Sequence, residues 1–299
     1  IFQRGPPLLY EQLQENGVPA KFILGPWDHI QGSTGADVGK AGYGSLDELK
    51  LRWFDHYLNG IDGQLDDIAP LTYFEQGSGD WVQKDRWIDS DLSARELTLS
   101  GTSAILGRSG ALTSGTPTAG RSIVPPIPVT GLCSRSANQW TAGIPRLLLP
   151  QLPCFTDNRL NDLGGLTFDT APVTEPIRFQ GPLNARLHVS SPTGDGMLSV
   201  AVEDVAPDGT VTRLTGGWQV LSHGALDTDR SRYLDGKLLQ AHHPFTKAAQ
   251  QKLKPGEVTP IDVELFPTGA AIQPGHKLRI AVQAFDLPHL LSPLTALLA

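Results

Sequence analysis

His29 is the residue whose type and position best suit catalysis. It follows the short apolar run Lys21–Leu24, which has the pattern of a buried parallel strand, and the break at Gly25 and Pro26. Folds of the α/β class place their active sites just beyond the C-terminal ends of such strands. An imidazole with a pKa of ~6.5 can accept and return a proton near neutral pH. This pattern suggests a general base at His29, and a loop histidine without a role is the alternative.

The sequence contains no G-x-S-x-G nucleophile elbow. In α/β-hydrolases the triad runs in the order Ser, then Asp or Glu, then His. A catalytic histidine so near Ile1 therefore predicts that the nucleophile and the acid lie upstream of this sequence. We expect the chain alone to be inactive, because a base without its nucleophile and acid is not activated.

The other polar and aromatic candidates suggest structural roles. Trp27, next to His29, could line a pocket, whereas Trp53 and Phe54 lie on a periodic helix and are expected in the core. Asp55 and His56 are expected to be structural. No histidine has the H-E-x-x-H or C-x-x-C…H spacing of zinc sites, so we expect no metal, and no cofactor is implied.

Cys133 and Cys154 are the only cysteines, and they flank an irregular, proline-rich stretch. Nothing around them is of the kind that lowers a thiol pKa, which argues against a catalytic thiol. A disulfide between them would close a loop and stabilise the fold by about 3 kcal/mol in the chain-entropy model. Such a bond would favour an extracellular setting, although the sequence alone leaves the localisation unknown. Two free buried thiols remain the alternative.

The predicted elements change character near residue 95. Before it we expect helices at 6–16 and 46–58, the second opened by a capping box of Ser45 and Glu48. A glycine-rich loop is expected from Trp27 to Gly44, and strands at 71–74 and 81–82. After it helical periodicity almost disappears, residues 107–131 suggest a surface loop, and short alternating segments separated by turns predict a β-sandwich. Those strands are expected at 96–99, 177–180, 185–190, 197–205, 211–214, 219–222, 259–265 and 278–284.

Composition restricts the partners. Hydrophobic residues make up 39% of the chain and its net charge is -7. A mildly acidic globular chain has no electrostatic reason to bind nucleic acid or an anionic membrane surface. No apolar run approaches the roughly 20 residues needed to span a bilayer. The sequence leaves the oligomeric state unknown.

Several motifs resemble the CocE/NonD family of hydrolases, which holds cocaine-esterase-like enzymes and α-amino-acid ester hydrolases. The first is G-P-W-D-H at Gly25–His29, followed by W-F-D-H-Y-L-N-G at Trp53–Gly60. Leu166–Pro172, Asp204–Gly209 and Pro274–Ile280 then match, in the family's order, the C-terminal domain that these hydrolases share with X-Pro dipeptidyl peptidases.

The resemblance implies a role for His29 as the base of a Ser-His-Asp triad. The acid would be the residue immediately before Ile1, and the serine would lie further upstream. The implied fold is the C-terminal part of an α/β-hydrolase domain at residues 1–95 and a jelly-roll β-sandwich at 96–299. The implied activity is hydrolysis of acyl esters or acyl-peptide bonds, with a small-molecule ester or peptide as substrate.

Two other functions remain open. An X-Pro dipeptidyl aminopeptidase would need an upstream cluster that captures the substrate amine. A non-catalytic module that binds carbohydrate or a protein partner would show exposed aromatic side chains on one sheet face. Beyond Ser100 the only tryptophans are Trp140 and Trp218, which is weak support for the second alternative.

Overall fold

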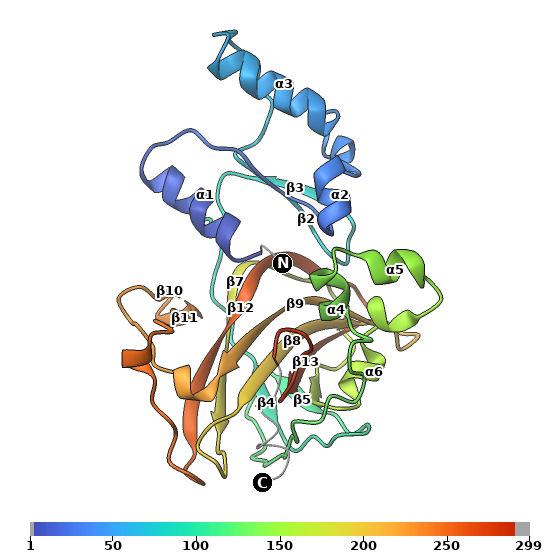
Figure 1. The fold of residues 1–299 in the computed structure, drawn as a ribbon, viewed down its shortest axis with the longest axis vertical. Helices are drawn as coiled ribbons and strands as arrows, with labels where there is room; N and C mark the ends of the chain where they lie inside the picture. The colour runs from blue at the N-terminus through green and yellow to red at the C-terminus, as the bar shows by residue number, and fades with distance from the viewer. Residues whose placement is uncertain (1–2, 291–299) are drawn as a thin grey trace.

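The computed structural model describes residues 3–290. Figure 1 shows helices around a small sheet in the N-terminal part and, below them, a larger part dominated by strands. Mixed sheets with few helices therefore make up the molecule. Within the described residues, no helix combines the length and the apolar character needed to cross a membrane.

The N-terminal part is built on a three-stranded sheet of order β1-β2-β3, in which β1 and β2 are parallel and β2 and β3 antiparallel. Its elements are α1 (Gly5–Glu15), β1 (Phe22–Leu24), α2 (His29–Thr34), η1 (Val38–Ala41), α3 (Leu46–Tyr57), β2 (Leu71–Phe74) and β3 (Trp81–Lys84).

Both predicted helices of this part are present, and α3 begins as expected. The Ser45 side chain accepts a hydrogen bond from the Glu48 amide at 3.2 Å, and the Glu48 carboxylate accepts one from the Ser45 amide at 2.6 Å. This capping box satisfies two amides that have no partner within the helix. It fixes the residue at which α3 begins.

Three expectations for this part were wrong. The strand before His29 is only half-buried, because β1 lies at an edge of the sheet. The segment from Trp27 to Gly44 is not simply a loop, since it holds α2 and η1. Phe54 is 53% exposed, because it lies on the outer side of α3, while Leu49 is buried and Trp53 half-buried on the inner side.

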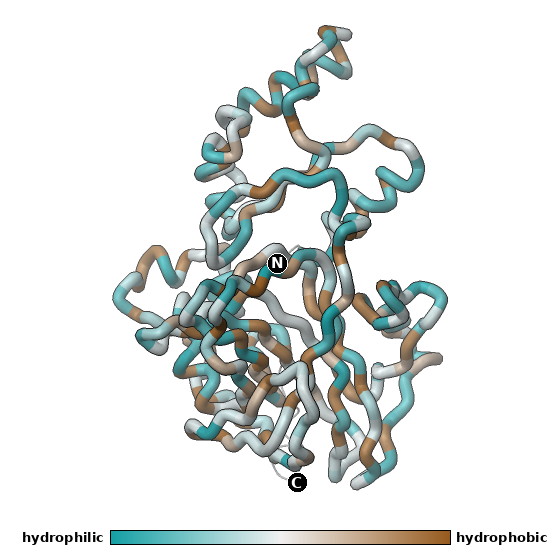
Figure 2. Tube along the Cα trace, turned by 180° about the vertical axis from the view of Figure 1, so that it is seen from behind, coloured by the Kyte–Doolittle hydropathy of each residue, from teal (hydrophilic) through white to brown (hydrophobic). Residues whose placement is uncertain are grey.

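The larger part contains two sheets that share one apolar core. A six-stranded sheet has the order β4-β5-β6-β13-β8-β9, and the two long strands β7 and β12 form an antiparallel ribbon against it. Only β5 and β6 run parallel within the six-stranded sheet. Apolar positions recur along these strands in Figure 2, interleaved with polar ones. The strands are β4 (Thr98–Ser100), β5 (Gly110–Thr113), β6 (Leu166–Asp169), β7 (Ile177–Val189), β8 (Met197–Val205), β9 (Val211–Val220), β12 (Thr259–Ile272) and β13 (Lys277–Gln283).

Two pairs of predicted short strands are in fact single long strands. The strand continues through the expected break at Gly181, where glycine adopts a left-handed φ of 95° and the register shifts at a bulge in the facing strand β12, between Leu265 and Thr268. The expected break before Gln219 lies within β9. There Gly217 is needed because the β12 backbone passes so close that a Cβ would lie 1.8 Å from the Glu264 carbonyl oxygen.

The sequence patterns missed several short elements. These are β5 inside the expected loop at 107–131, β6, the hairpin β10 (Arg232–Leu234) and β11 (Lys237–Gln240), and three helices, α4 (Arg135–Trp140), α5 (Ile144–Leu148) and α6 (Arg159–Asp162). We call residues 131–165, which hold the three helices and both cysteines, the disulfide segment.

The N-terminal part is joined to the larger part by backbone pairing as well as by the chain. The turn between β2 and β3 reaches β12, where the Gln76 amide donates to the Gly269 carbonyl at 3.0 Å and the Ala271 amide donates to the Gln76 carbonyl at 2.8 Å. A side chain at Gly77 could not be accommodated there, since its Cβ would lie 2.1 Å from the Ala271 carbonyl oxygen.

Candidate functional site

His29 lies beyond the C-terminal end of β1, where the sequence predicted it. It is the first residue of α2, and its side chain is exposed. The residues before it, 25–28, form a tight connection from the sheet to the helix. The contacts that hold this connection in place therefore also place His29.

The Trp27 side chain fixes the connection between β1 and α2. Its indole nitrogen donates to the Ala36 carbonyl at 2.5 Å, and its ring packs against Trp81 of β3 with centroids 5.9 Å apart. The ring also folds back over Gly25, where a Cβ would lie 2.3 Å from Trp27 Cε2. The tryptophan of the G-P-W-D-H motif can therefore take this position only because residue 25 is glycine. Trp27 makes structural contacts in this chain, and its predicted pocket role is untested.

Asp28 starts the helix that carries His29. Its carboxylate accepts a hydrogen bond from the Gln31 amide at 2.9 Å, and the Gln31 side chain accepts one from the Asp28 amide at 3.2 Å. Gly35 ends the helix with a left-handed φ of 64°. The pattern D-x-x-Q at the start of α2 was a usable signal of this capping box, and sequence reasoning missed it.

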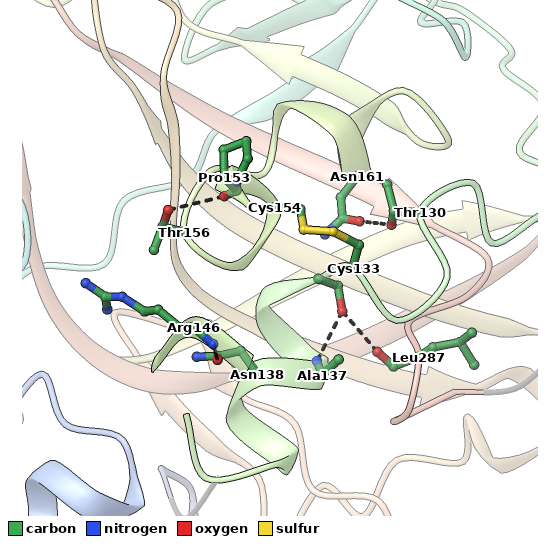
Figure 3. Close-up of a disulfide and its surroundings, with 11 residues drawn as sticks. Thr130, Cys133, Ala137, Asn138, Arg146, Pro153, Cys154, Thr156, Asn161 and Leu287 are labelled. Carbon is green, nitrogen blue, oxygen red and sulfur yellow. Dashed lines mark hydrogen bonds between the residues drawn. A yellow bond between two sulfur atoms is a disulfide. The ribbon is translucent and has the colours of Figure 1, made fainter. Parts of the chain in front are cut away.

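The disulfide segment approaches this loop from the larger part of the molecule. Cys133 and Cys154 are bonded in the structure, with Cα atoms 5.5 Å apart (Figure 3). The turn between α4 and α5 lies against α2: a Cβ at Gly143 would be 2.2 Å from Oδ2 of Asp28. No sequence pattern pointed to this contact, because the two residues are far apart along the chain.

A buried polar cluster holds the disulfide segment to the sandwich. The Ser136 hydroxyl donates to Asp286 Oδ2 at 2.8 Å, and Arg213 Nη1 and Trp218 Nε1 donate to the same oxygen at 3.3 and 2.7 Å. Next to it, the Ser134 hydroxyl donates to the Leu287 carbonyl at 3.2 Å. These bonds fix α4 relative to β9 and the chain after β13.

A second buried cluster lies where α6 meets β8 and β13. Arg279 Nη1 donates to Asp162 Oδ2 at 2.7 Å, and Asn158 Nδ2 donates to Glu203 Oε1 at 2.7 Å. Burial, and then the negative charge of Asp162, raise the pKa of Glu203 well above its ordinary value. Asn158, Asp162 and Glu203 line a small polar cavity, and His29 is not among the residues around it.

The remaining candidates have structural contacts. His276 Nδ1 lies 2.8 Å from Asp204 Oδ1, a structural contact. Trp140 and Trp218 meet unexpectedly at His289: Trp140 Nε1 donates to its Nδ1 at 2.7 Å, and the Trp218 ring stacks on it with centroids 4.0 Å apart. Across residues 3–290, no group of three or more His, Cys, Asp or Glu side chains is arranged to hold a metal ion.

Among proteins similar in sequence are two esterases by name. A protein of Mycobacterium bovis, described provisionally as a serine esterase, is 28% identical over 271 residues, which cover 90% of this chain and 41% of that protein. The cocaine esterase of a Rhodococcus species is 23% identical over 291 residues, 92% of this chain and 45% of the esterase. The chain thus spans less than half the length of these relatives.

Solved structures share the fold. An aminopeptidase from the archaeon Thaumarchaeota archaeon has a TM-score of 0.65 at 20% identity, covering 96% of this chain and 46% of that one. An α-amino-acid ester hydrolase has a TM-score of 0.65 at 19% identity, with coverages of 93% and 45%. A CocE/NonD family hydrolase of Staphylococcus aureus has a TM-score of 0.52 at 17% identity, with coverages of 83% and 39%.

The resemblance to CocE/NonD hydrolases that the motifs indicated is therefore confirmed. The family model that matches covers residues 63–297, so the loop of His29 lies before the matched range. Because this range is most of the sequence, the chain belongs to the family of X-Pro dipeptidyl-peptidase C-terminal non-catalytic domains.

Proposed function

We propose that this chain supplies the general base, His29, of a serine hydrolase that cleaves acyl esters through a Ser-His-Asp triad. The observation that carries the proposal is the position of His29 at the C-terminal end of β1, on a helix start that Trp27 and Asp28 hold in place. The esterases among the relatives support the same reaction class.

In this proposal the serine and the aspartate come from residues upstream of Ile1. His29 takes the proton of the serine hydroxyl as the serine attacks the acyl carbon, and later gives it to the leaving group. The aspartate holds the imidazole in the tautomer that accepts this proton. The chain alone then lacks two of the three groups and is inactive, and no cofactor takes part.

We further propose that residues 1–95 are the last part of an α/β-hydrolase domain and that 96–299 form a jelly-roll sandwich against it. Two features support an incomplete first domain. The outer edge of β1 has no neighbouring strand among the described residues. The outer side of α3 carries exposed Leu51, Phe54 and Leu58, spaced as one helical face.

The test uses the longer protein, obtained by sequencing upstream of Ile1. Hydrolysis of p-nitrophenyl acyl esters would be compared for wild type, His29→Ala and His188→Ala. His188 is a matched control because it is also exposed and lies on β7, in the other part of the molecule. We expect His29→Ala to lose about 10³-fold or more in kcat with unchanged folding, and His188→Ala to keep full activity.

The proposal would be refuted if His29→Ala were as active as wild type. It would also be refuted if the upstream sequence lacked a serine elbow. Parallel assays with an X-Pro p-nitroanilide separate the two enzyme classes. If the anilide is cleaved and the esters are not, the peptidase alternative replaces the esterase. A longer protein that cleaves neither substrate would favour the binding module.

A further inference from the structure

The contact between Gly143 and Asp28 joins the two parts of the molecule at the candidate base. A Cβ built on Gly143 would lie 2.2 Å from Oδ2, 2.7 Å from Cγ and 3.2 Å from Cβ of Asp28. The whole carboxylate therefore rests on the backbone of the α4–α5 turn. Only a residue without a side chain leaves room for it.

The Asp28 carboxylate cannot move away from Gly143 without affecting His29. Its Oδ1 accepts the hydrogen bond from the Gln31 amide that starts α2, and His29 is the first residue of that helix. An N-cap side chain is worth about 1 kcal/mol to its helix. Swinging the carboxylate aside would break the cap and release the first turn, including the imidazole of His29.

The α4–α5 turn is itself held rigidly. The Gly143 amide donates to the Asn138 carbonyl at 2.8 Å, and the Asn138 side chain accepts from the Arg146 amide at 2.9 Å. Two residues earlier, Ser136 is bonded to the buried Asp286. The disulfide closes the segment on its other side. A continuous series of fixed contacts therefore runs from the core of the sandwich to the cap of α2.

We propose that the α4–α5 turn is a positioning element for His29, in which Gly143 supports the Asp28 carboxylate and so holds the imidazole in one orientation. The importance of this orientation for catalysis rests on the proposed function. The contact gives the sandwich, whose family is described as non-catalytic, a direct effect on the geometry of the base.

The test is nuclear magnetic resonance of the histidine rings, with the chain labelled at histidine and the His29 signal assigned from His29→Gln. Gly143→Ala should shift the His29 ring resonance more than that of any other histidine. Gly131→Ala is the matched control, because Gly131 lies in the same segment and also has a positive φ, of 56°, but nothing lies within 4 Å of a Cβ there. It should leave the His29 resonance in place.

Two further comparisons separate the effect of the Asp28 contact from the effect of backbone strain at position 143. Asparagine adopts left-handed backbone more readily than alanine, so Gly143→Asn and Gly131→Asn repeat the comparison if Gly143→Ala does not fold. Asp28→Gly removes every Asp28 atom that the new Cβ would meet. In that background Gly143→Ala should cause no further shift of the His29 resonance, because the two residues would act through one contact.

Equal shifts of the His29 resonance in the Gly143 and Gly131 variants would overturn the proposal. So would a full Gly143→Ala shift in the Asp28→Gly background. The result is independent of the esterase assay, since the rings are observed in this chain without a substrate. A shift that depends on Gly143, combined with an active His29→Ala enzyme, would uphold the positioning and refute the catalytic role.

Discussion

Gly25 and Trp27 show how single residues of the G-P-W-D-H motif depend on each other. The indole ring occupies the space that a side chain at position 25 would need, and in that place it bonds Ala36 and packs on Trp81. The motif is thus a packing unit as well as the approach to a candidate base. The last residue of the motif, His29, owes its place to this unit.

We predict that Gly25→Ala destabilises the chain by about 1–3 kcal/mol, as overpacking of a tight site does. The new methyl group would push the Trp27 ring off Trp81 and break its bond to Ala36. Gly32→Ala is the control, since its Cβ would lie at an ordinary 3.7 Å from Trp27 Cβ. It should stabilise α2 by about 0.5–1 kcal/mol. Urea denaturation followed by tryptophan fluorescence measures both, and equal stabilities of the two variants would contradict this account.

Among the elements, α6 and β8 meet through two buried carboxyl groups. Glu203 is fully buried and Asp162 is 8% exposed, and one oxygen of each, Glu203 Oε2 and Asp162 Oδ1, has no hydrogen-bond partner. Burial, and then the negative charge of Asp162, raise the pKa of Glu203. Asp162 is paired with Arg279, so we assign a proton to Glu203.

This proton makes stability depend on pH in a defined direction. A carboxyl group whose pKa is raised by folding binds more protons in the folded than in the unfolded state, so the free energy of unfolding falls as pH rises between the two pKa values. We expect the free energy of unfolding to fall at pH values above the ordinary pKa range of glutamate. Glu203→Gln, which keeps a donor towards Asp162, should reduce the slope, whereas Glu257→Gln, at an exposed site, should leave it unchanged. Melting temperatures measured across pH test this dependence. An unaltered slope in Glu203→Gln would contradict a proton held on Glu203.

Elements with a local cause were predictable from the sequence. The capping box starts α3 where Ser45 and Glu48 indicated, and β8 has the predicted bounds because turns flank a mostly apolar segment. The position of His29 after a strand was predictable for the same reason. Elements fixed by tertiary contacts were not: α4 is held by Asp286, and the glycines of β7 and β9 imitate turns although the strands continue through them.

In the site itself the same distinction holds. Asp28 could have been identified as a cap, because Gln31 follows at the required spacing. Gly143 could not have been identified, because it contacts Asp28, which is distant in sequence and is brought near only by the fold. Phe54 was misplaced because α3 is apolar on two sides, and sequence periodicity does not tell which side faces the core of this chain.

At the scale of the whole molecule, the exposed side of α3 differs from an ordinary protein surface. Leu51 is 61%, Phe54 53% and Leu58 74% exposed, and the helix projects away from the sandwich in Figure 1. Adjacent exposed apolar side chains of this kind normally mark an interaction surface. Its proposed partner is the remainder of the hydrolase domain.

We therefore predict that the double variant Leu51→Gln, Leu58→Gln binds less of the dye anilinonaphthalene sulfonate than the unaltered chain. Its stability should change by no more than about 0.5 kcal/mol, as is typical of surface positions. Ile123→Gln removes a single side chain that is 78% exposed elsewhere and should hardly affect dye fluorescence. If the double variant binds the dye as strongly as the unaltered chain, the face of α3 is not the main exposed apolar surface.

The place of β13 in the six-stranded sheet has a consequence for how the protein is made. This strand lies between β6 and β8, although it follows both of them by a long stretch of sequence. While the ribosome is still adding the residues before Lys277, the sheet exists only as two unjoined halves, β4-β5-β6 and β8-β9, each with an open edge. Open strand edges invite pairing with other chains. Translation must therefore pass β13 before the two halves can join, and until then both open edges are accessible to pairing with other chains.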